Sequence, residues 1–229
     1  MVGFLLVWAG ARPAAAQGEF GRVEQVPDTN WRKQANSGER FDLVFERGFL
    51  IPTNQPDSVP LSIARSGSYF IGASINLLFA ERWRLRIQPG VSIFKMTFQQ
   101  SAGKTYPTPA DSLSEEKIRN SYIELPIGVA YVLNRDEQFR TVSFLELGIR
   151  PGVFLASSYK WTTQLNGEQA KVKLPLNDDF NWFRLGAYAK VTYRFLGFYT
   201  YYRFSELFQQ DIESPPAVSG LEFGICVQI

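Results

Sequence analysis

Strict alternation of two kinds of side chain along residues 139–158 constrains the fold of this chain more than any other feature. The odd positions from Leu145 to Leu155 are all apolar, whereas the even positions include Glu146, Arg150 and small residues. A period of two is typical of a β-strand whose two faces meet different environments. The apolar set extends over about ten residues, the length that a tilted strand needs to cross a bilayer. The segment therefore predicts a strand that crosses an outer membrane.

The same alternation recurs along the chain and predicts eight strands. We expect them near 41–46, 68–80, 83–98, 118–133, 139–158, 183–194, 198–204 and 221–229. Long connections at 51–67, 99–117, 159–178 and 209–219 alternate with short ones at 81–82, 134–138 and 196–197. Bacterial outer-membrane barrels have short periplasmic turns and longer extracellular loops. The predicted fold is all-β, an eight-stranded antiparallel up-and-down transmembrane β-barrel.

Two irregularities are expected inside the strands. After Ile93 the apolar set moves to Phe94, Met96 and Phe98, which indicates a bulge or the end of the membrane band. Pro89 and Pro151 lie in two near-identical Ile-x-Pro-Gly-Val segments, and proline is unfavourable inside a central strand. The glycine that follows each proline favours a local bulge or kink.

The chain divides into three predicted regions. Residues 1–17 combine a short apolar run with Ala14 and Ala16, as a secretory signal peptide does, with cleavage expected near Ala16 or Gln17. Residues 18–40 are polar and aperiodic, and we interpret them as a periplasmic N-terminal extension. Residues 41–229 form the predicted outer-membrane barrel.

Composition excludes several classes of chemistry. The chain has no histidine, which removes Ser-His-Asp and Cys-His catalysis and the usual zinc and iron sites. Cys226 is the only cysteine, so no internal disulfide can form. A net charge of +2 gives no field that would favour nucleic acid. We expect no catalytic, cofactor-binding or metal site, and no nucleic-acid partner.

Alternation alone does not decide which face of the barrel points inward. A soluble lipocalin-like barrel would bury the apolar face and expose the charges to water. However, the polar face also carries many glycines and rings such as Tyr122 and Tyr188, which suit a narrow, filled lumen. Aromatic residues also stand near predicted strand ends, where membrane barrels carry aromatic girdles: Trp83, Tyr131, Trp182 and Tyr193. These features favour the membrane barrel, in contact with outer-membrane lipid.

In a membrane barrel, the charges of the polar face would be buried and would have to pair with one another. We predict a lumen network that contains Glu46, Arg84, Arg86, Glu124, Glu146, Arg150, Arg184, Arg203 and Glu222. An eight-stranded barrel has room for side chains and little else. Structural filling of the lumen is therefore favoured over a translocation path.

Three segments resemble the PorT-like outer-membrane β-barrel family. They are Tyr122-Ile123-Glu124-Leu125-Pro126, Leu147-Gly148-Ile149-Arg150-Pro151-Gly152, and Tyr201-Tyr202-Arg203-Phe204 with Leu207-Phe208, ahead of an alternating C-terminal strand. The resemblance implies an eight-stranded barrel in the outer membrane of a Gram-negative bacterium. The namesake of the family takes part in type IX protein secretion and gliding.

The leading functional hypothesis is a non-enzymatic integral outer-membrane barrel that is structural or accessory to an envelope complex, with other envelope proteins as partners. Two alternatives stay open at this point. One is a soluble periplasmic ligand-binding barrel, and the other is an outer-membrane enzyme that works without histidine.

Overall fold

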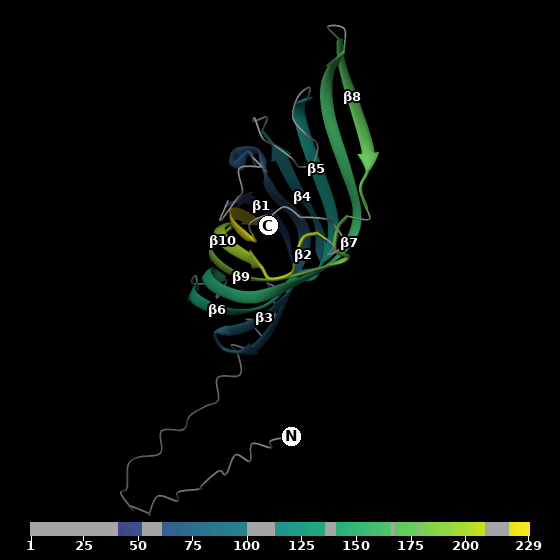
Figure 1. Ribbon diagram of the computed structural model, residues 1–229. Coiled ribbons are helices and arrows are strands. Elements are labelled where there is room, and N and C mark those ends of the chain that lie inside the picture. The colour runs from purple at the N-terminus through teal and green to yellow at the C-terminus, as the bar shows by residue number, and fades with distance from the viewer. Residues whose placement is uncertain are drawn as a thin grey trace, which may run out of the picture.

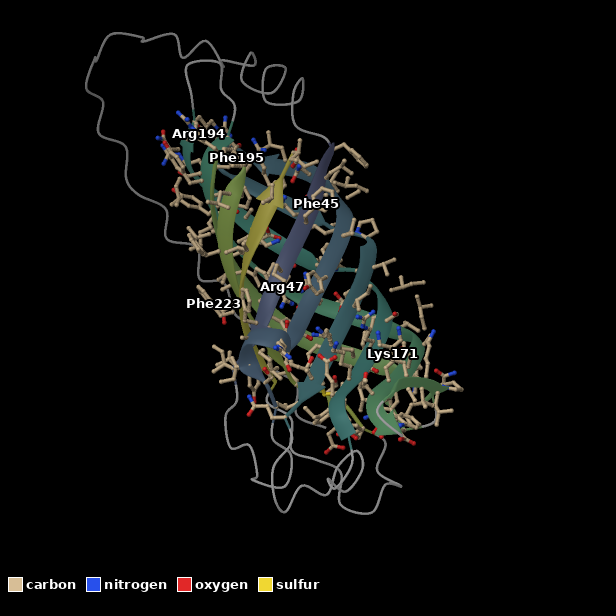
Figure 2. All side chains as sticks on the ribbon, turned by 90° about the horizontal axis from the view of Figure 1, so that it is seen from above. Phe45, Arg47, Lys171, Arg194, Phe195 and Phe223 are labelled. Carbon is tan, nitrogen blue, oxygen red and sulfur yellow. The ribbon has the colours of Figure 1, made fainter. Side chains whose placement is uncertain are left out.

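Large apolar side chains cover the outside of the sheet, and polar side chains line its inside. The computed structural model describes residues 41–51, 61–99, 113–135, 141–165, 168–177, 179–208 and 220–229; the predicted signal peptide at 1–17 and extension at 18–40 lie outside these residues. Ile71 is 60% exposed and Leu147 58% exposed, as are many other apolar residues on the outer face, including Phe45 and Phe223 (Figure 2). This arrangement is the reverse of a soluble barrel and is typical of a lipid-facing band around a polar lumen.

The described strands form a closed antiparallel barrel (Figure 1). They are β1 (Phe41–Leu50), β2 (Gly67–Ala80), β3 (Trp83–Ile87), β4 (Gly90–Phe98), β5 (Leu113–Glu124), β6 (Ile127–Arg135), β7 (Thr141–Leu165), β8 (Glu168–Pro175), β9 (Phe183–Tyr193), β10 (Leu196–Arg203) and β11 (Leu221–Gln228), with a short 3-10 helix η1 at Ile63–Arg65. β1 pairs with β2 on one side and with β11 on the other, which closes the sheet. The predicted eight-stranded barrel is confirmed, with β3 and β4 acting as one barrel strand and β5 and β6 as another.

Three prolines lie in one row where these two barrel strands are interrupted. The backbone N–H of Ala73 donates to the carbonyl of Pro89 at 3.0 Å, and the N–H of Gln88 donates to the carbonyl of Pro126 at 2.8 Å. In the next pair, the N–H of Leu125 donates to the carbonyl of Pro151 at 2.9 Å. Each proline thus accepts a ladder hydrogen bond without needing the N–H that it lacks.

The bulge expected at Pro151 does not occur, because β7 runs through this residue and pairs it with Leu185 without a register shift. The irregularity in β7 comes later: Ser121 pairs with Ala156 and Tyr122 with Phe154, so Leu155 is an extra residue. This bulge lets Leu155 and Ala156 both lie on the outer side. Pro89, in contrast, does lie at a strand break, as expected.

The change of apolar phase after Ile93 marks the end of the membrane band. β4 pairs with β5 without a register shift from Gly90 to Phe98, so no bulge occurs there. Phe94 and Met96 are buried inside the barrel, whereas Lys95 lies on the outer side. The lumen becomes apolar at this level just as the outer surface becomes charged.

The segment predicted as a loop at 159–178 is a β-hairpin. β7 continues to Leu165, and β8 returns antiparallel to it from Glu168 to Pro175. The start of β5 extends alongside, from Leu113 and not from 118 as expected. Figure 1 shows β7 and β8 rising well beyond the rest of the barrel.

The two ends of the barrel differ in the way predicted, but the turn expected at 196–197 lies at 194–195. Leu196 and Gly197 belong to β10, and Arg194 makes the turn with a φ of 53°. Short turns at Glu81–Arg82 and Arg194–Phe195 join strands at one end, and the β7–β8 hairpin stands at the other, as the labelled Arg194, Phe195 and Lys171 show in Figure 2. By the rule for bacterial outer-membrane barrels, the hairpin end is extracellular and the short-turn end periplasmic. Trp83 and Tyr131 contact each other near the short-turn end, with ring centroids 4.9 Å apart. Among the described residues, no helix is long and apolar enough to cross a membrane.

Candidate functional site: the filled lumen

All nine charged residues predicted for the lumen network point into the barrel. Each is at most 7% exposed. They come from β1 (Glu46), β3 (Arg84, Arg86), β5 (Glu124), β7 (Glu146, Arg150), β9 (Arg184), β10 (Arg203) and β11 (Glu222). Each residue belongs to the polar set of its strand, so the period of two places all of them on the inner face.

Glu146 is the most fully satisfied carboxylate of the lumen. Its Oε2 accepts a hydrogen bond from Arg86 Nη1 at 2.7 Å. Its Oε1 accepts from Gln88 Nε2 at 2.8 Å and from the hydroxyl of Tyr188 at 2.5 Å. The side chain is completely buried. A guanidinium and two neutral donors thus replace the water that this carboxylate loses on burial.

Glu46 and Glu124 continue the network around Arg150. Lys190 Nζ lies 2.5 Å from Glu46 Oε1, and the guanidinium of Arg150 donates to the other oxygen of Glu46. Arg150 Nε lies 3.5 Å from Glu124 Oε2. Gln88 links this group to Glu146, since Lys190 Nζ donates to Gln88 Oε1 at 3.3 Å. The two sets of ion pairs therefore form one connected network.

Arg184 extends the network toward β11. It lies 3.3 Å from Glu124 Oε1 and 3.0 Å from Glu222 Oε1, and its Nε donates to the hydroxyl of Tyr201 at 3.0 Å. Ser68 donates a further hydrogen bond to Glu222. Cations and carboxylates thus alternate across the barrel, which is the arrangement that limits the cost of burying charge.

Aromatic rings fill the space between the charges. The guanidinium of Arg150 lies 4.8 Å from the ring centre of Phe70, and that of Arg184 lies 4.8 Å from the ring centre of Tyr201. Such cation–π contacts are stronger where water is excluded. Tyr188 crosses directly over the backbone of Gly128, where an added Cβ would lie 2.4 Å from its hydroxyl. Glycines on the polar face therefore make room for large rings on neighbouring strands.

Seven of the nine predicted residues take part in the ion pairs described above, and two lie elsewhere in the lumen. Arg203 approaches the ring of Phe94, at 5.6 Å from its centroid. Arg84 lines a small hollow of about 100 Å³ at the short-turn end, beside Asp42 and Arg194.

Sequence reasoning did not include Lys190, Gln88 and Tyr188 in the predicted network. Lys190, Gln88 and Tyr188 all stand in the polar set of their strands, so the alternation marks them as inward-facing. Nothing in the sequence shows which inward residues meet across the barrel, because these contacts join strands far apart in the chain.

The half of the interior nearer the β7–β8 hairpin is apolar. Phe94, Met96, Ile118, Tyr122, Phe180 and Phe208 belong to one buried cluster there. Phe180 and Phe208 pack with ring centroids 5.0 Å apart. Within this region the hydroxyl of Tyr159 donates to buried Glu116 at 2.5 Å. Two layers of side chains therefore fill the lumen: a charged layer in the middle and an apolar layer nearer the β7–β8 hairpin.

The chemistry of this interior is that of a packed core. Within the described residues, no group of three or more His, Cys, Asp or Glu side chains is placed to hold a metal ion. The carboxylates of Glu46, Glu124, Glu146 and Glu222 each face a guanidinium or ammonium group. The arrangement holds the strands in register from inside.

Comparison with known proteins places the chain among outer-membrane barrels. The profile of the family described as outer membrane protein beta-barrel domain matches residues 27–209. No curated protein sequence matches the chain. Among solved structures, the chain is similar to Ail, the attachment invasion locus protein of Yersinia pestis, with 9% sequence identity and a TM-score of 0.36, over 82% of this chain and 92% of that one. The closed barrel, its apolar exterior and the family match together show an integral protein of the Gram-negative outer membrane that belongs to the outer membrane protein beta-barrel domain family.

Proposed function

We propose that this protein is a non-enzymatic scaffold of the outer membrane that serves an envelope complex through its extracellular hairpin. The filled lumen is the observation that carries the proposal. A charged layer and an apolar layer occupy the interior in succession, and an eight-stranded barrel has little room for anything else. A barrel of this kind is suited to anchoring and recognition, and unsuited to diffusion of a solute through its centre.

The β7–β8 hairpin supports a role in protein contacts. Among the described strands, β8 pairs with β7 alone, so its other edge offers free backbone groups. The hairpin face that carries Tyr159 and Trp161 also carries Leu174, which is 47% exposed. A partner strand can add to a free edge of this kind, and apolar side chains beside it supply specificity.

The PorT-like resemblance suggests protein secretion as the process in which such a complex would act. The enzymatic alternative has less support, because the lumen carboxylates that form ion pairs with Arg or Lys are buried away from solvent. They are Glu46, Glu124, Glu146 and Glu222. A lumen carboxylate that is to act as a general base needs access to a substrate.

A photo-crosslinking residue in native envelopes tests the proposal. We expect a crosslinker at Leu174, on the hairpin, to give discrete adducts with envelope proteins. A crosslinker at Phe223, which faces lipid, should give lipid adducts only. The same protein in planar bilayers should show no conductance steps, because the lumen is filled.

Two results would contradict the proposal. Protein adducts that form equally at both positions would show that the hairpin has no special role. Stable open-channel currents from the purified wild-type protein would show that the lumen is a transport path.

A further inference from the structure

Six cationic side chains gather on the outer side of the sheet, immediately beyond the lipid-facing band. They are Lys95, Lys117, Arg119, Lys160, Lys171 and Lys173, from β4, β5, β7 and β8, and we call this surface the basic face. Their neighbours Glu116, Ile118 and Asn120 are buried inside, so the alternation directs the cations outward. Lys171 marks the position of the basic face in Figure 2.

The basic face begins where the apolar band stops. On β4 the exposed Ile93 is followed two residues later by Lys95, a distance of about 7 Å along a strand. On β5, which runs in the opposite direction, Arg119 and Ser121 precede the exposed Ile123 on the same face. The cations therefore lie at the level of the headgroups of the outer leaflet, given the extracellular position of the hairpin.

Like charges stand directly opposite one another on this face. Lys117 pairs with Lys160, and Lys160 pairs with Lys173, in one row across three strands. In a neighbouring row Lys95 pairs with Arg119. Opposed like charges destabilise a sheet. An anion bound between these rows would attract the cations on both sides and so offset their mutual repulsion.

One carboxylate within the described residues is paired with this face. Glu115 Oε1 lies 2.7 Å from Lys117 Nζ and 3.7 Å from Arg65 Nη1. The hydrogen bond from Lys117 holds the pKa of Glu115 below its ordinary value, so this group is ionised at neutral pH. Among the described residues, six cations against this one carboxylate leave the basic face with an excess of positive charge.

The cations surround a hollow that also has an apolar wall. A shallow depression of about 660 Å³ is lined by Ile93, Arg119, Ser121, Lys160, Lys173 and Pro175, among others. A second hollow of about 370 Å³ adjoins it and shares Arg119, Lys160 and Lys173. A ligand here would meet cations and hydroxyls at one end and the edge of the lipid-facing band at the other. This combination suits an amphiphile better than a soluble anion.

We propose that the basic face binds the phosphate groups of a phosphorylated lipid of the outer leaflet, with the acyl chains of that lipid against the adjacent apolar band. Phosphate accepts charge-assisted hydrogen bonds from Lys and Arg, and several cations can share its charge. Because the site adjoins Ile93 and Ile123, a lipid bound with its phosphates on the basic face would have the orientation of the other lipids of the outer leaflet.

Binding of diphosphorylated lipid A to the full mature chain in detergent, measured by native mass spectrometry, tests the proposal. The variant pair Lys160→Gln and Lys173→Gln should weaken binding by about tenfold or more, because each lost cation removes a charge-assisted contact. The matched control replaces Arg82→Gln and Arg194→Gln in the short turns at the other end, and should leave binding unchanged. The affinity of wild-type protein for dephosphorylated lipid A should be no higher than the affinity of the variant for phosphorylated lipid A. Added salt should lower the affinity of wild-type protein for the phosphorylated lipid.

A second readout separates binding from folding. Without lipid, the Lys160→Gln and Lys173→Gln variant should be at least as heat-stable as wild type, since opposed like charges have been removed. Added phosphorylated lipid should then stabilise the wild type more than the variant. If the variant fails to fold, the comparison of phosphorylated with dephosphorylated lipid on wild-type protein still decides the question.

Three outcomes would overturn the proposal. Equal affinity of the variant and the wild type for lipid A would remove the basic face from the site. Competition by inorganic phosphate at the same concentration as the lipid would indicate a free-phosphate site. Equally tight binding of a heparin fragment, with the same dependence on Lys160 and Lys173, would assign the surface to a soluble polyanion.

Discussion

At the scale of single residues, burial of charge determines which side chains the barrel depends on. Glu146 compensates the charge of Arg86 and also accepts from Gln88 and Tyr188. Removal of this carboxylate takes from Arg86 its buried ion-pair partner at 2.7 Å and leaves only Asp42, at 3.9 Å and partly exposed. The same ion pair on the surface would contribute little to the free energy of unfolding, because water and salt screen its charges.

The variant Glu146→Leu should therefore lower the free energy of unfolding by about 3–5 kcal/mol. Urea titration of the protein in lipid vesicles, followed by tryptophan fluorescence, measures this change. The matched control is Glu206→Leu at an exposed position, where we expect a change within about 0.5 kcal/mol.

A second variant examines the cause of the loss. Replacement of both partners, Arg86→Leu with Glu146→Leu, should recover part of the stability, because the unpaired charge disappears. Equal stability of Glu146→Leu and wild type would contradict burial and pairing of this group.

At the scale of elements, the β7–β8 hairpin is the feature that the expected strand pattern left out. Its two strands join through Asn166-Gly167, a dipeptide typical of two-residue hairpin turns. Tyr159 and Trp161 on the first strand, and Val172 and Leu174 on the second, each keep a period of two. These signals could have predicted the hairpin, but the many Lys, Thr and Gln residues around them resemble a polar loop. The bulge at Leu155 also shifts the phase between the two parts of β7.

Shortening the hairpin should leave the barrel intact. Deletion of residues 161–165 and 168–172 would join Lys160 to Lys173 through the native Asn166-Gly167, and these two lysines are already cross-strand partners. The barrel keeps the pairing between β7 and β9. The deletion also removes the pair of Glu116 with Trp161 and the packing of Trp161 on the apolar cluster, so the free energy of unfolding should fall, by no more than about 3 kcal/mol. Heat-modifiable migration on a gel and urea titration measure this outcome.

A milder deletion provides the control for the role of the hairpin in protein contacts. Removal of residues 163–165 and 168–170 retains the pairs Trp161 with Val172 and Thr162 with Lys171. Adducts from a crosslinker at Leu174 should persist in this variant and decrease in the larger deletion. Loss of the folded barrel in the larger deletion would instead show that the hairpin is needed for folding.

At the scale of the whole molecule, the orientation in the membrane follows from the two unlike ends of the barrel. Lys171 and Arg194 are both exposed, and they stand at opposite ends (Figure 2). Cys226 is the only cysteine of the chain and is fully buried, so a new cysteine can be labelled selectively.

In intact cells, a membrane-impermeant maleimide should label Lys171→Cys and should not label Arg194→Cys. Arg194→Cys should react only after the outer membrane is opened, because short turns of such barrels are periplasmic. Wild-type protein, with Cys226 alone, is the background control. Labelling in the opposite order would invert the orientation and would remove the basic face from the outer leaflet.

The sequence by itself determined the architecture of this protein, because alternation is a local property that each strand carries separately. Residues 144–155 show an apolar and a polar face without reference to any other segment, and eight such segments with alternating short and long connections imply a barrel. The same alternation placed all nine predicted lumen charges on the polar faces of their strands, and these faces point inward in the structure. Membership in a family of outer-membrane barrels agrees with this conclusion.

Only the tertiary structure decided which of these residues meet. The link from Lys190 through Gln88 to Glu146, and the pairing of Lys117, Lys160 and Lys173 in one row, depend on strand register and on the curvature of the closed sheet. These are properties of strand pairs, and a shift of one residue would send every side chain to the other face. The segment at 139–158 thus fixed the two environments of its side chains, whereas closure of the barrel gave Glu146 and Arg150 their partners.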